Sequence, residues 1–195
     1  MQETIEIKRK EFVVLYSLDE KQKIVERKGK TYLMVDYSND KETFLQYINS
    51  ENKLRTSGIR IPKLYIYDKN KMLVVKEHIE GDTVLDLLIK EDLKDEVFEE
   101  IFAINFMMKI HKIKLDFDPI NFRYFDGKLY YLSDFCKVFD ENASFEKEGI
   151  FLWFYSPDFV KYLSKKGLPV DQNRMSKVPG QLNKQIALTV VKYYR

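Results

Sequence analysis

Cysteine, glycine, proline and histidine are all scarce in this sequence. Its 195 residues include one cysteine, seven glycines, five prolines and two histidines. A single cysteine cannot form a disulfide bond within the chain, so the sequence predicts a reducing compartment, and we expect a cytoplasmic protein. Glycine and proline interrupt helices and strands, so their low content favours regular secondary structure along most of the chain.

The two histidines do not indicate a zinc site. His78 and His111 lie far apart in the sequence, and neither has a cysteine close to it. Protein zinc sites combine several such ligands at short spacings. We therefore assign neither histidine a metal-binding or catalytic role.

Long apolar runs are also absent. No run approaches the roughly 20 residues that a membrane-spanning helix needs, and the N-terminal M-Q-E-T-I-E-I-K-R-K has no apolar segment typical of a secretory signal. Hydrophobic residues still make up 45% of the chain and charged residues 33%, which is typical of a soluble globular protein and not of a disordered one. The length fits one domain or two small lobes that share an interface.

The charge is unevenly distributed along the chain. The net charge is +2, but residues 161–195 carry eight basic residues and one acidic residue, Asp171, which gives this tail +7 and leaves −5 on residues 1–160. Such a basic tail indicates an acidic partner, which could be nucleic acid, an anionic surface or an acidic face of another protein. Alternatively, the tail docks on the acidic body of its own chain. The sequence leaves both interpretations open.

Local patterns predict a series of strands followed by a series of helices. Alternating and β-prone residues bounded by turn residues predict the strands, and apolar residues three or four apart predict the helices. The predicted strands are residues 12–16, 23–27, 31–38, 64–68 and 72–77, and the predicted helices are residues 40–56, 83–88, 96–111, 145–154 and 158–165. Residues 181–194 fit either a helix or a strand.

The strongest local signal is a hairpin within residues 114–136, which read K-L-D-F-D-P-I-N-F-R-Y-F-D-G-K-L-Y-Y-L-S-D-F-C. Residues 122–125 and 129–132 are β-prone and rich in aromatic side chains. Asp126-Gly127 between them is a typical two-residue hairpin turn. The sequence therefore predicts two antiparallel strands at this point.

Polar side chains flank both ends of this hairpin. Asp116 and Asn121 precede it and Asp134 follows it, so the turn is expected to bring the three together. Two carboxylates and an amide provide the oxygen ligands that Mg²⁺ prefers. The pattern therefore predicts a magnesium site, although aspartate and asparagine are also common as ordinary loop residues.

The same stretch resembles the catalytic and metal-binding loops of protein-kinase-like phosphotransferases. It is closest to the small atypical branch, which includes the aminoglycoside and choline phosphotransferases and the small kinase of the tRNA threonylcarbamoylation machinery. Those loops often read H-G-D-x-x-P-x-N, and residues 114–121, K-L-D-F-D-P-I-N, match all but the first two positions. Residues 134–136, D-F-C, stand in place of D-F-G. The resemblance extends, with decreasing specificity, over roughly residues 10–165.

The resemblance implies an α+β fold of the two-lobed protein-kinase-like type. Residues 1–76 would form a small N-lobe with an antiparallel sheet and one helix. Residues 77–195 would form a hinge, a reduced and mainly helical C-lobe, and the basic C-terminal tail.

The resemblance also implies an ATP- and Mg²⁺-dependent phosphotransferase. Asp116 would orient or deprotonate the acceptor hydroxyl, while Asn121 and Asp134 would bind Mg²⁺. Residues 74–83, V-V-K-E-H-I-E-G-D-T, resemble the hinge pattern V-M-E-Y-I-E-G-E-T. There the adenine would bond to the backbone carbonyl of Glu77 and the backbone amide of Ile79. The acceptor substrate leaves no signature in the sequence.

Three departures from the family pattern support an alternative, a pseudokinase that acts as a nucleotide-responsive binding or scaffold module. Residues 16–22, Y-S-L-D-E-K-Q, lack the glycines of a phosphate-binding loop. Asp36 aligns with the strand lysine that normally pairs with the phosphates, and a carboxylate there would repel them. Glu51 is the candidate for the helix glutamate that normally holds this lysine, but no lysine is evident for it to hold.

Overall fold

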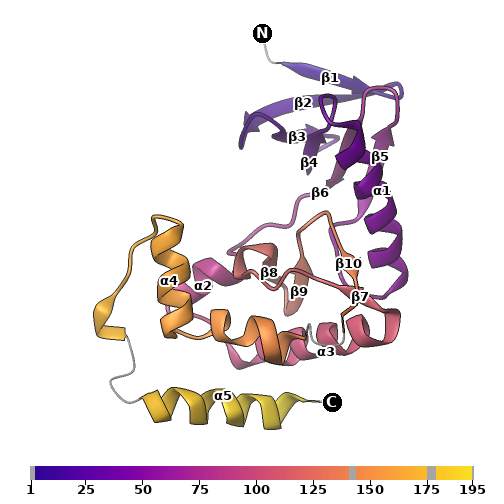
Figure 1. The fold of residues 1–195 in the computed structure, drawn as a ribbon. Coiled ribbons are helices and arrows are strands. Elements are labelled where there is room, and N and C mark those ends of the chain that lie inside the picture. The colour runs from indigo at the N-terminus through magenta and orange to yellow at the C-terminus, as the bar shows by residue number, and fades with distance from the viewer. Residues whose placement is uncertain (1–2, 141–143, 175–178, 195) are drawn as a thin grey trace.

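The computed structural model describes residues 3–140, 144–174 and 179–194, and it has a mixed α+β fold. Residues 3–77 form the sheet region, which contains a six-stranded antiparallel sheet and one helix (Figure 1). The described residues from 84 onward form the helical region, and residues 78–83 connect the two. The prediction of an α+β fold is confirmed.

The large sheet has the strand order β1-β2-β3-β4-β6-β5, and every neighbouring pair is antiparallel. Its strands are β1 (Thr4–Ile7), β2 (Lys10–Ser17), β3 (Gln22–Arg27), β4 (Lys30–Asp36), β5 (Leu64–Asp68) and β6 (Leu73–Glu77). All five predicted strands are present within a residue or two. The edge strand β1 was not predicted, because only Ile7 of its four residues is fully buried and so short a pattern carries little signal.

Helix α1 (Lys41–Thr56) follows β4 and packs on one face of the sheet. Asp40 caps this helix, since its carboxylate accepts the amide of Thr43 at 3.0 Å. Gly58 follows the helix in the left-handed conformation at φ +76°, which glycine adopts without strain. The predicted bounds of 40–56 are confirmed within one residue.

The helical region is built around α3 (Asp95–His111). Its other helices are α2 (Val84–Ile89), α4 (Pro157–Lys165) and α5 (Pro179–Tyr193). Two strand pairs lie in this region, β7 (Ile113–Lys114) with β10 (Lys137–Val138) and β8 (Phe122–Phe125) with β9 (Lys128–Tyr131). Its short helical turns are η1 (Pro119–Asn121), η2 (Phe145–Gly149), η3 (Ile150–Trp153) and η4 (Gln172–Arg174). The segment predicted as one helix over 145–154 is a π-helical turn followed by a 3-10 turn. The C-terminal segment is a helix and not a strand.

The β8–β9 hairpin forms as the sequence predicted. Phe125 and Lys128 are paired across a two-residue turn. Asp126 and Gly127 in that turn have φ of 49° and 70°, which is the conformation that an Asp-Gly hairpin turn adopts. The hairpin therefore returns the chain to the loop that carries Asp116 and Asn121.

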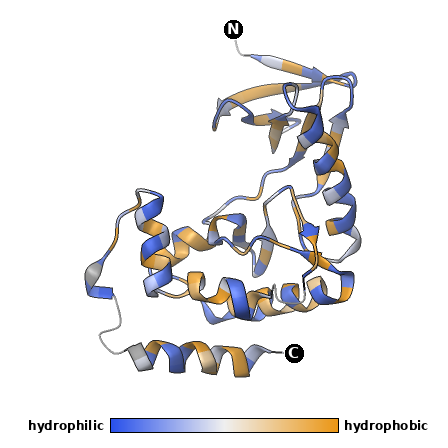
Figure 2. Ribbon diagram, in the orientation of Figure 1, coloured by the Kyte–Doolittle hydropathy of each residue, from blue (hydrophilic) through white to orange (hydrophobic). Residues whose placement is uncertain are grey.

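The two regions bury their apolar residues differently. In the sheet region most of the buried apolar residues lie in two small clusters, one that includes Ile7 and Phe12 and another that includes Val35 and Phe44. In the helical region a single cluster surrounds α3 and extends to α2, the β8–β9 hairpin and η3. Hydrophobic residues accordingly recur along α2 and α3 (Figure 2). Among the described residues, no helix is both long enough and apolar enough to cross a membrane.

Candidate functional site

Asp134 lies where the helical region meets the sheet region. Its Oδ1 forms an ion pair with the ammonium group of Lys76 on β6, and its Oδ2 accepts a hydrogen bond of 2.7 Å from the hydroxyl of Tyr37, just after β4. The Lys76 side chain is only 5% exposed and that of Asp134 is 17% exposed. Both carboxylate oxygens of Asp134 are therefore bonded to the sheet region.

Burial and the negative charge of Asp134 together raise the pKa of Tyr37 far above its ordinary value. The Tyr37 hydroxyl consequently stays protonated and remains a hydrogen-bond donor. The ring of Tyr37 stacks on Tyr47 of α1, with 5.7 Å between ring centroids. Burial and the negative charge of Asp134 raise the pKa of Tyr47 as well. Both tyrosine side chains are therefore uncharged.

Lys76 was not among the predicted site residues. It follows the buried Leu73, Val74 and Val75 in β6 and is itself buried. A lysine is rarely fully buried unless it is paired. Within residues 74–83 it stands where the family's hinge pattern has methionine. A lysine that follows three apolar residues in a strand, at a position that is apolar in the family, could have been identified as a candidate site residue.

Glu51 lies close to this ion pair. Its side chain lines a narrow cavity together with Tyr47, Lys76 and Asp134, and the residue is 8% exposed. Its ion-pair partner, however, is Arg55, one helical turn further along α1, with 3.6 Å between Oε1 and Nε. The structure thus places a lysine next to the predicted glutamate, but the lysine binds Asp134.

Asp116 and Asn121 lie side by side. The side-chain amide of Asn121 donates to the backbone carbonyl of Asp116 at 3.5 Å, and the carboxylate of Asp116 accepts the amide of Asp118 at 3.0 Å. The backbone amide of Leu132 donates to the carbonyl of Asn121 at 2.8 Å. This bond joins the loop before the hairpin to the segment that leads to Asp134.

Tyr131 connects the same two loops through its side chain. Its hydroxyl accepts the backbone amide of Asp116 at 3.3 Å and donates to the carbonyl of Phe135 at 2.9 Å. Burial raises the pKa of Tyr131 to about 12, so the hydroxyl stays protonated. Trp153 supports the first loop, because its indole N–H donates to the carbonyl of Phe117 at 2.9 Å.

A cavity of about 700 Å³ lies in front of Asp116. Asp116 and Asp118 line it together with Gln46 and Asn49 of α1, and Ser133 lines both this cavity and the narrow one beside Lys76. Asp134 faces the narrow cavity. The structure therefore brings Asp116 and Asn121 together and places Asp134 on the adjacent cavity.

Asp118, the second acid of the loop before the hairpin, bonds to groups that hold this loop in place. Its carboxylate accepts the amide of Ile120 and the hydroxyl of Tyr162, and it forms an ion pair of 3.3 Å with Lys166. Burial, and next the bond to Asp118, raise the pKa of Tyr162. Asp118 thus anchors η1 to α4.

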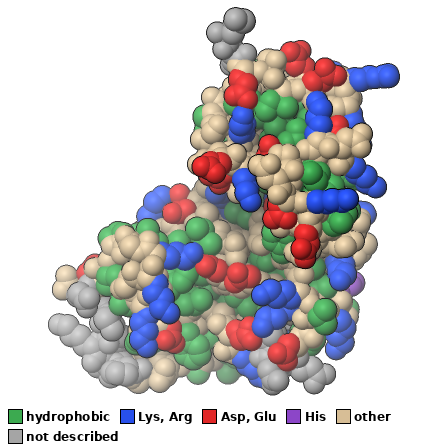
Figure 3. Space-filling model, turned by 45° about the horizontal axis from the view of Figure 1, so that its top comes forward, with side chains coloured by type: hydrophobic (Ala, Val, Ile, Leu, Met, Phe, Trp, Pro, Cys, Tyr) green, Lys and Arg blue, Asp and Glu red, His purple; other side chains and the backbone are tan. Residues whose placement is uncertain are grey.

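The segment with Glu77 and Ile79 borders a cavity of about 390 Å³. Strands β2, β3 and β4 form one wall, and His78, Glu80 and Gly81 form the other with Arg123 of β8. The carbonyl of Ile79 accepts a hydrogen bond from Arg123, while the amide of Ile79 bonds to no other described residue. Figure 3 shows the outline of the molecule indented between the two regions, with acidic and basic side chains intermingled there.

Two groups in this cavity are unusual. The Nε atom of Arg123 is buried and has no hydrogen-bond partner among the described residues. Burial, followed by the positive charge of Arg123, lowers the pKa of His78 below its ordinary value. His78 is therefore neutral near pH 7.

The residues that depart from the family pattern have local partners. The carboxylate of Asp36 accepts the amide of Ser38 at 2.7 Å and so stabilises the turn before α1. In the turn between β2 and β3, the carboxylate of Asp19 accepts the amides of Lys21 and Gln22, both at 2.7 Å. These two amides are thus already bonded within the turn.

Part of the basic tail docks on the acidic body. Lys192 pairs with Asp95 at 2.7 Å and Arg174 with Glu91 at 2.9 Å. Arg174 also donates to the carbonyls that end α2. Lys177 and Arg195 lie outside the described residues.

The chain matches no model of a known protein family, and no curated protein matches it either. In the described part of the chain, no three histidine, cysteine, aspartate or glutamate side chains are grouped so that they could hold a metal ion. Any metal at this site would therefore have at most two such side chains as ligands and would need asparagine, water or ligand oxygens in addition.

Proposed function

We propose that the protein is an ATP- and Mg²⁺-dependent phosphotransferase with a two-lobed kinase-like arrangement, in which the sheet region is the N-lobe and residues 76–81 are the hinge. The observation that carries this proposal is the buried ion pair between Lys76 and Asp134. This ion pair places a lysine next to the predicted metal-binding aspartate, although the sequence of β4 has no lysine at the expected position.

Lys76 reaches this position from a neighbouring strand. Leu33 of β4 and Lys76 of β6 are paired in register, and cross-strand partners project on the same side of a sheet. Lys76 can therefore substitute for a lysine on β4. Its ammonium group would exchange Asp134 for phosphate oxygens when a nucleotide binds, because a buried cation needs an anionic partner.

The donor set near Asp134 fits Mg²⁺. This ion commonly binds one or two carboxylates and fills the rest of its octahedron with water and phosphate oxygens. Asp134 and Asn121 would hold it, and the ion would neutralise charge on the transferred phosphoryl group. Asp116, which lines the open cavity of about 700 Å³, would orient the acceptor hydroxyl and receive its proton.

The adenine would occupy the cavity beside residues 78–81. The backbone amide of Ile79 would be the donor and the backbone carbonyl of Glu77 the acceptor, as the hinge resemblance implies. Leu15 and Ile24 provide an apolar wall for a flat ring. A volume of about 390 Å³ is within the range of small-ligand sites.

The proposal is tested by melting temperature against ATP with and without Mg²⁺, alongside ADP release in the presence of candidate acceptors. We expect Asp134→Asn to abolish the Mg²⁺-dependent shift, and Asp116→Asn to keep the shift but lose phosphate transfer. Asp126→Asn in the hairpin turn is the matched control and should behave like the parent. A normal Mg²⁺-ATP shift in the Asp134 variant would reject the metal site.

A pseudokinase that binds nucleotide without transfer is the second candidate. Two observations favour it: both oxygens of Asp134 are already bonded, and the amides of the β2–β3 turn are occupied by Asp19. This candidate predicts a melting shift with ATP that does not depend on Mg²⁺. It also predicts no ADP release with any acceptor.

A further inference from the structure

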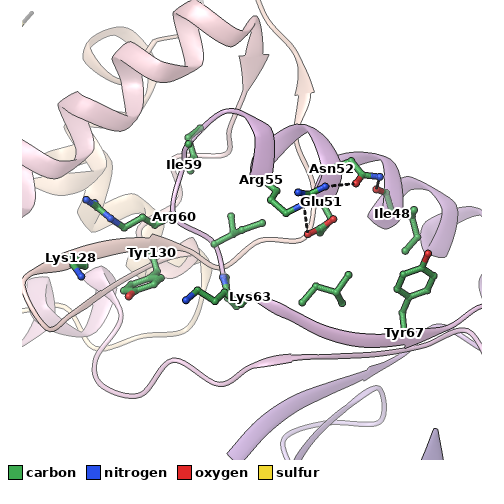
Figure 4. A pocket seen from close by; sticks show the side chains of 14 residues that line it. Ile48, Glu51, Asn52, Arg55, Ile59, Arg60, Lys63, Tyr67, Lys128 and Tyr130 are labelled. Carbon is green, nitrogen blue, oxygen red and sulfur yellow. Dashed lines mark hydrogen bonds and ion pairs between the residues drawn. The ribbon is translucent and has the colours of Figure 1, made fainter. Parts of the chain in front are cut away.

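A second large cavity lies on a different face of α1. It has a volume of about 820 Å³ and is enclosed by the C-terminal half of α1, residues 58–64 and the β8–β9 hairpin (Figure 4). Ile48, Asn52 and Arg55 line it from the helix, whereas Gln46 and Asn49 line the cavity in front of Asp116. At 3.6 residues per turn these positions project in different directions, so α1 separates the two cavities.

The charges around this cavity are mostly positive. Glu51 is the one carboxylate among the lining residues, and four cations line it: Arg55, Arg60, Lys63 and Lys128. Arg55 pairs with Glu51, and Arg60 pairs with Glu100 outside the cavity. Lys63 and Lys128 have no ion-pair partner within the described ranges. Two ammonium groups are thus available to an anion.

The cavity also has an apolar part. Ile61, Pro62 and Leu64 form it together with Ile48 and the ring of Tyr67. Figure 4 shows the two parts at opposite ends, with Arg60, Lys63, Lys128 and Tyr130 at one end and Ile48 and Tyr67 at the other. The Arg55–Glu51 pair lies between them. A ligand that matches this arrangement has an anionic end and an apolar body.

We propose that this cavity binds a small amphipathic organic anion. Its carboxylate, sulfonate or phosphate group would bind Lys63 and Lys128, and its aliphatic or aromatic body would cover Ile48, Pro62 and Leu64. The volume is that of a site for a small organic molecule, and such sites combine an apolar lining with a few polar groups that fix orientation. The proposal does not depend on the phosphotransferase activity.

The probe is 8-anilinonaphthalene-1-sulfonate, which joins a sulfonate to an aromatic body, and its binding to the full chain is measured by calorimetry. N-phenyl-1-naphthylamine, which lacks the sulfonate, is the matched neutral probe. The test variant is the double substitution Lys63→Ala and Lys128→Ala. Lys69→Ala in the turn between β5 and β6 is the control, because Lys69 is exposed and lies outside the cavity.

We expect the double variant to bind the sulfonate about tenfold more weakly, since each exposed charge contributes up to about fivefold in affinity. The control should stay within about twofold of the parent, and the neutral probe should bind the parent and the double variant equally. Ile48→Trp, which fills the apolar end, should weaken both probes. Equal sulfonate affinity in the parent and the double variant would overturn the proposal, as would no effect of Ile48→Trp, because binding would then be adventitious adsorption elsewhere.

Discussion

The sheet region and the helical region contribute different things to the candidate site. The helical region positions the two loops: Trp153 holds the carbonyl of Phe117, and Tyr131 joins the backbone of Asp116 to that of Phe135. The sheet region supplies charge and a proton donor to Asp134 through Lys76 and Tyr37. Their cores differ accordingly, since one continuous cluster lies under the loops whereas the sheet has a small cluster on each face. Loop geometry and electrostatics can therefore be perturbed separately.

The largest expected effect tests whether the helical core holds the loops. Trp153 is fully buried against Phe122 and Phe145. Trp153→Ala should lower the free energy of unfolding by about 3–5 kcal/mol, because it leaves a cavity and removes the bond to Phe117. Phe151→Ala in the same 3-10 turn is the control, since Phe151 is 38% exposed. Urea denaturation measures both, and similar losses would contradict a special role for Trp153.

The next effect tests the charge that the sheet region supplies. Lys76→Met keeps most of the side-chain volume but leaves the Asp134 carboxylate partly buried without its cation. We expect a loss of about 3 kcal/mol, which is typical when one partner of a buried ion pair is removed. Adding Asp134→Asn should recover part of this loss, because the unpaired charge is then gone. Strictly additive effects of the two substitutions would show that the pair makes no energetic contribution.

A smaller effect tests the connection that Tyr131 makes between the loop with Asp116 and the segment with Phe135. Tyr131→Phe removes the hydroxyl that bonds to both of them and should cost about 1–2 kcal/mol, because buried groups lose their partners. Tyr130→Phe is the control, since its hydroxyl makes no hydrogen bond to a described residue. If the site depends on this connection, Tyr131→Phe also weakens the Mg²⁺-dependent shift with ATP. An unchanged shift would assign Tyr131 to stability alone.

The smallest effect concerns pH at the connecting segment. Burial and Arg123 lower the pKa of His78 in the folded state, so the unfolded chain binds a proton more readily as the pH falls through about 6.5. This contribution to stability is present above that pH and is lost below it. His78→Gln should therefore make the melting temperature fall less between about pH 7.5 and 5.5. An identical pH dependence in parent and variant would contradict the shift.

Local sequence patterns predicted most of the secondary structure. The Asp-Gly turn and the periodicity of residues 96–111 correspond to elements at nearly the expected positions. Each depends on residues within a few positions of one another. The strand β1 and the π-helical turn at Phe145–Gly149 were not predicted, because pairing with β2 and packing in the core decide them.

The roles of the predicted site residues came only from the family pattern. The charges that meet at the site could not be predicted from the sequence. The family pattern has a lysine on β4, where this sequence has Asp36. The cation that pairs with Asp134 is Lys76 of β6. The pattern of residues 161–195 left two interpretations of the basic tail. The structure pairs Lys166, Arg174 and Lys192 with carboxylates of the body, while an external acidic partner stays untested.

The sequence by itself determined the hairpin turn and most of the helices and strands, because those interactions join residues that are close along the chain. Only the tertiary structure decided which charges meet. Lys76 and Asp134 are 58 positions apart, and Tyr37 and Asp134 are 97 positions apart. No local pattern carries information over such separations. Strand order and the packing of the hairpin under the sheet region bring these groups together, because burying an isolated charge there would cost more than pairing it.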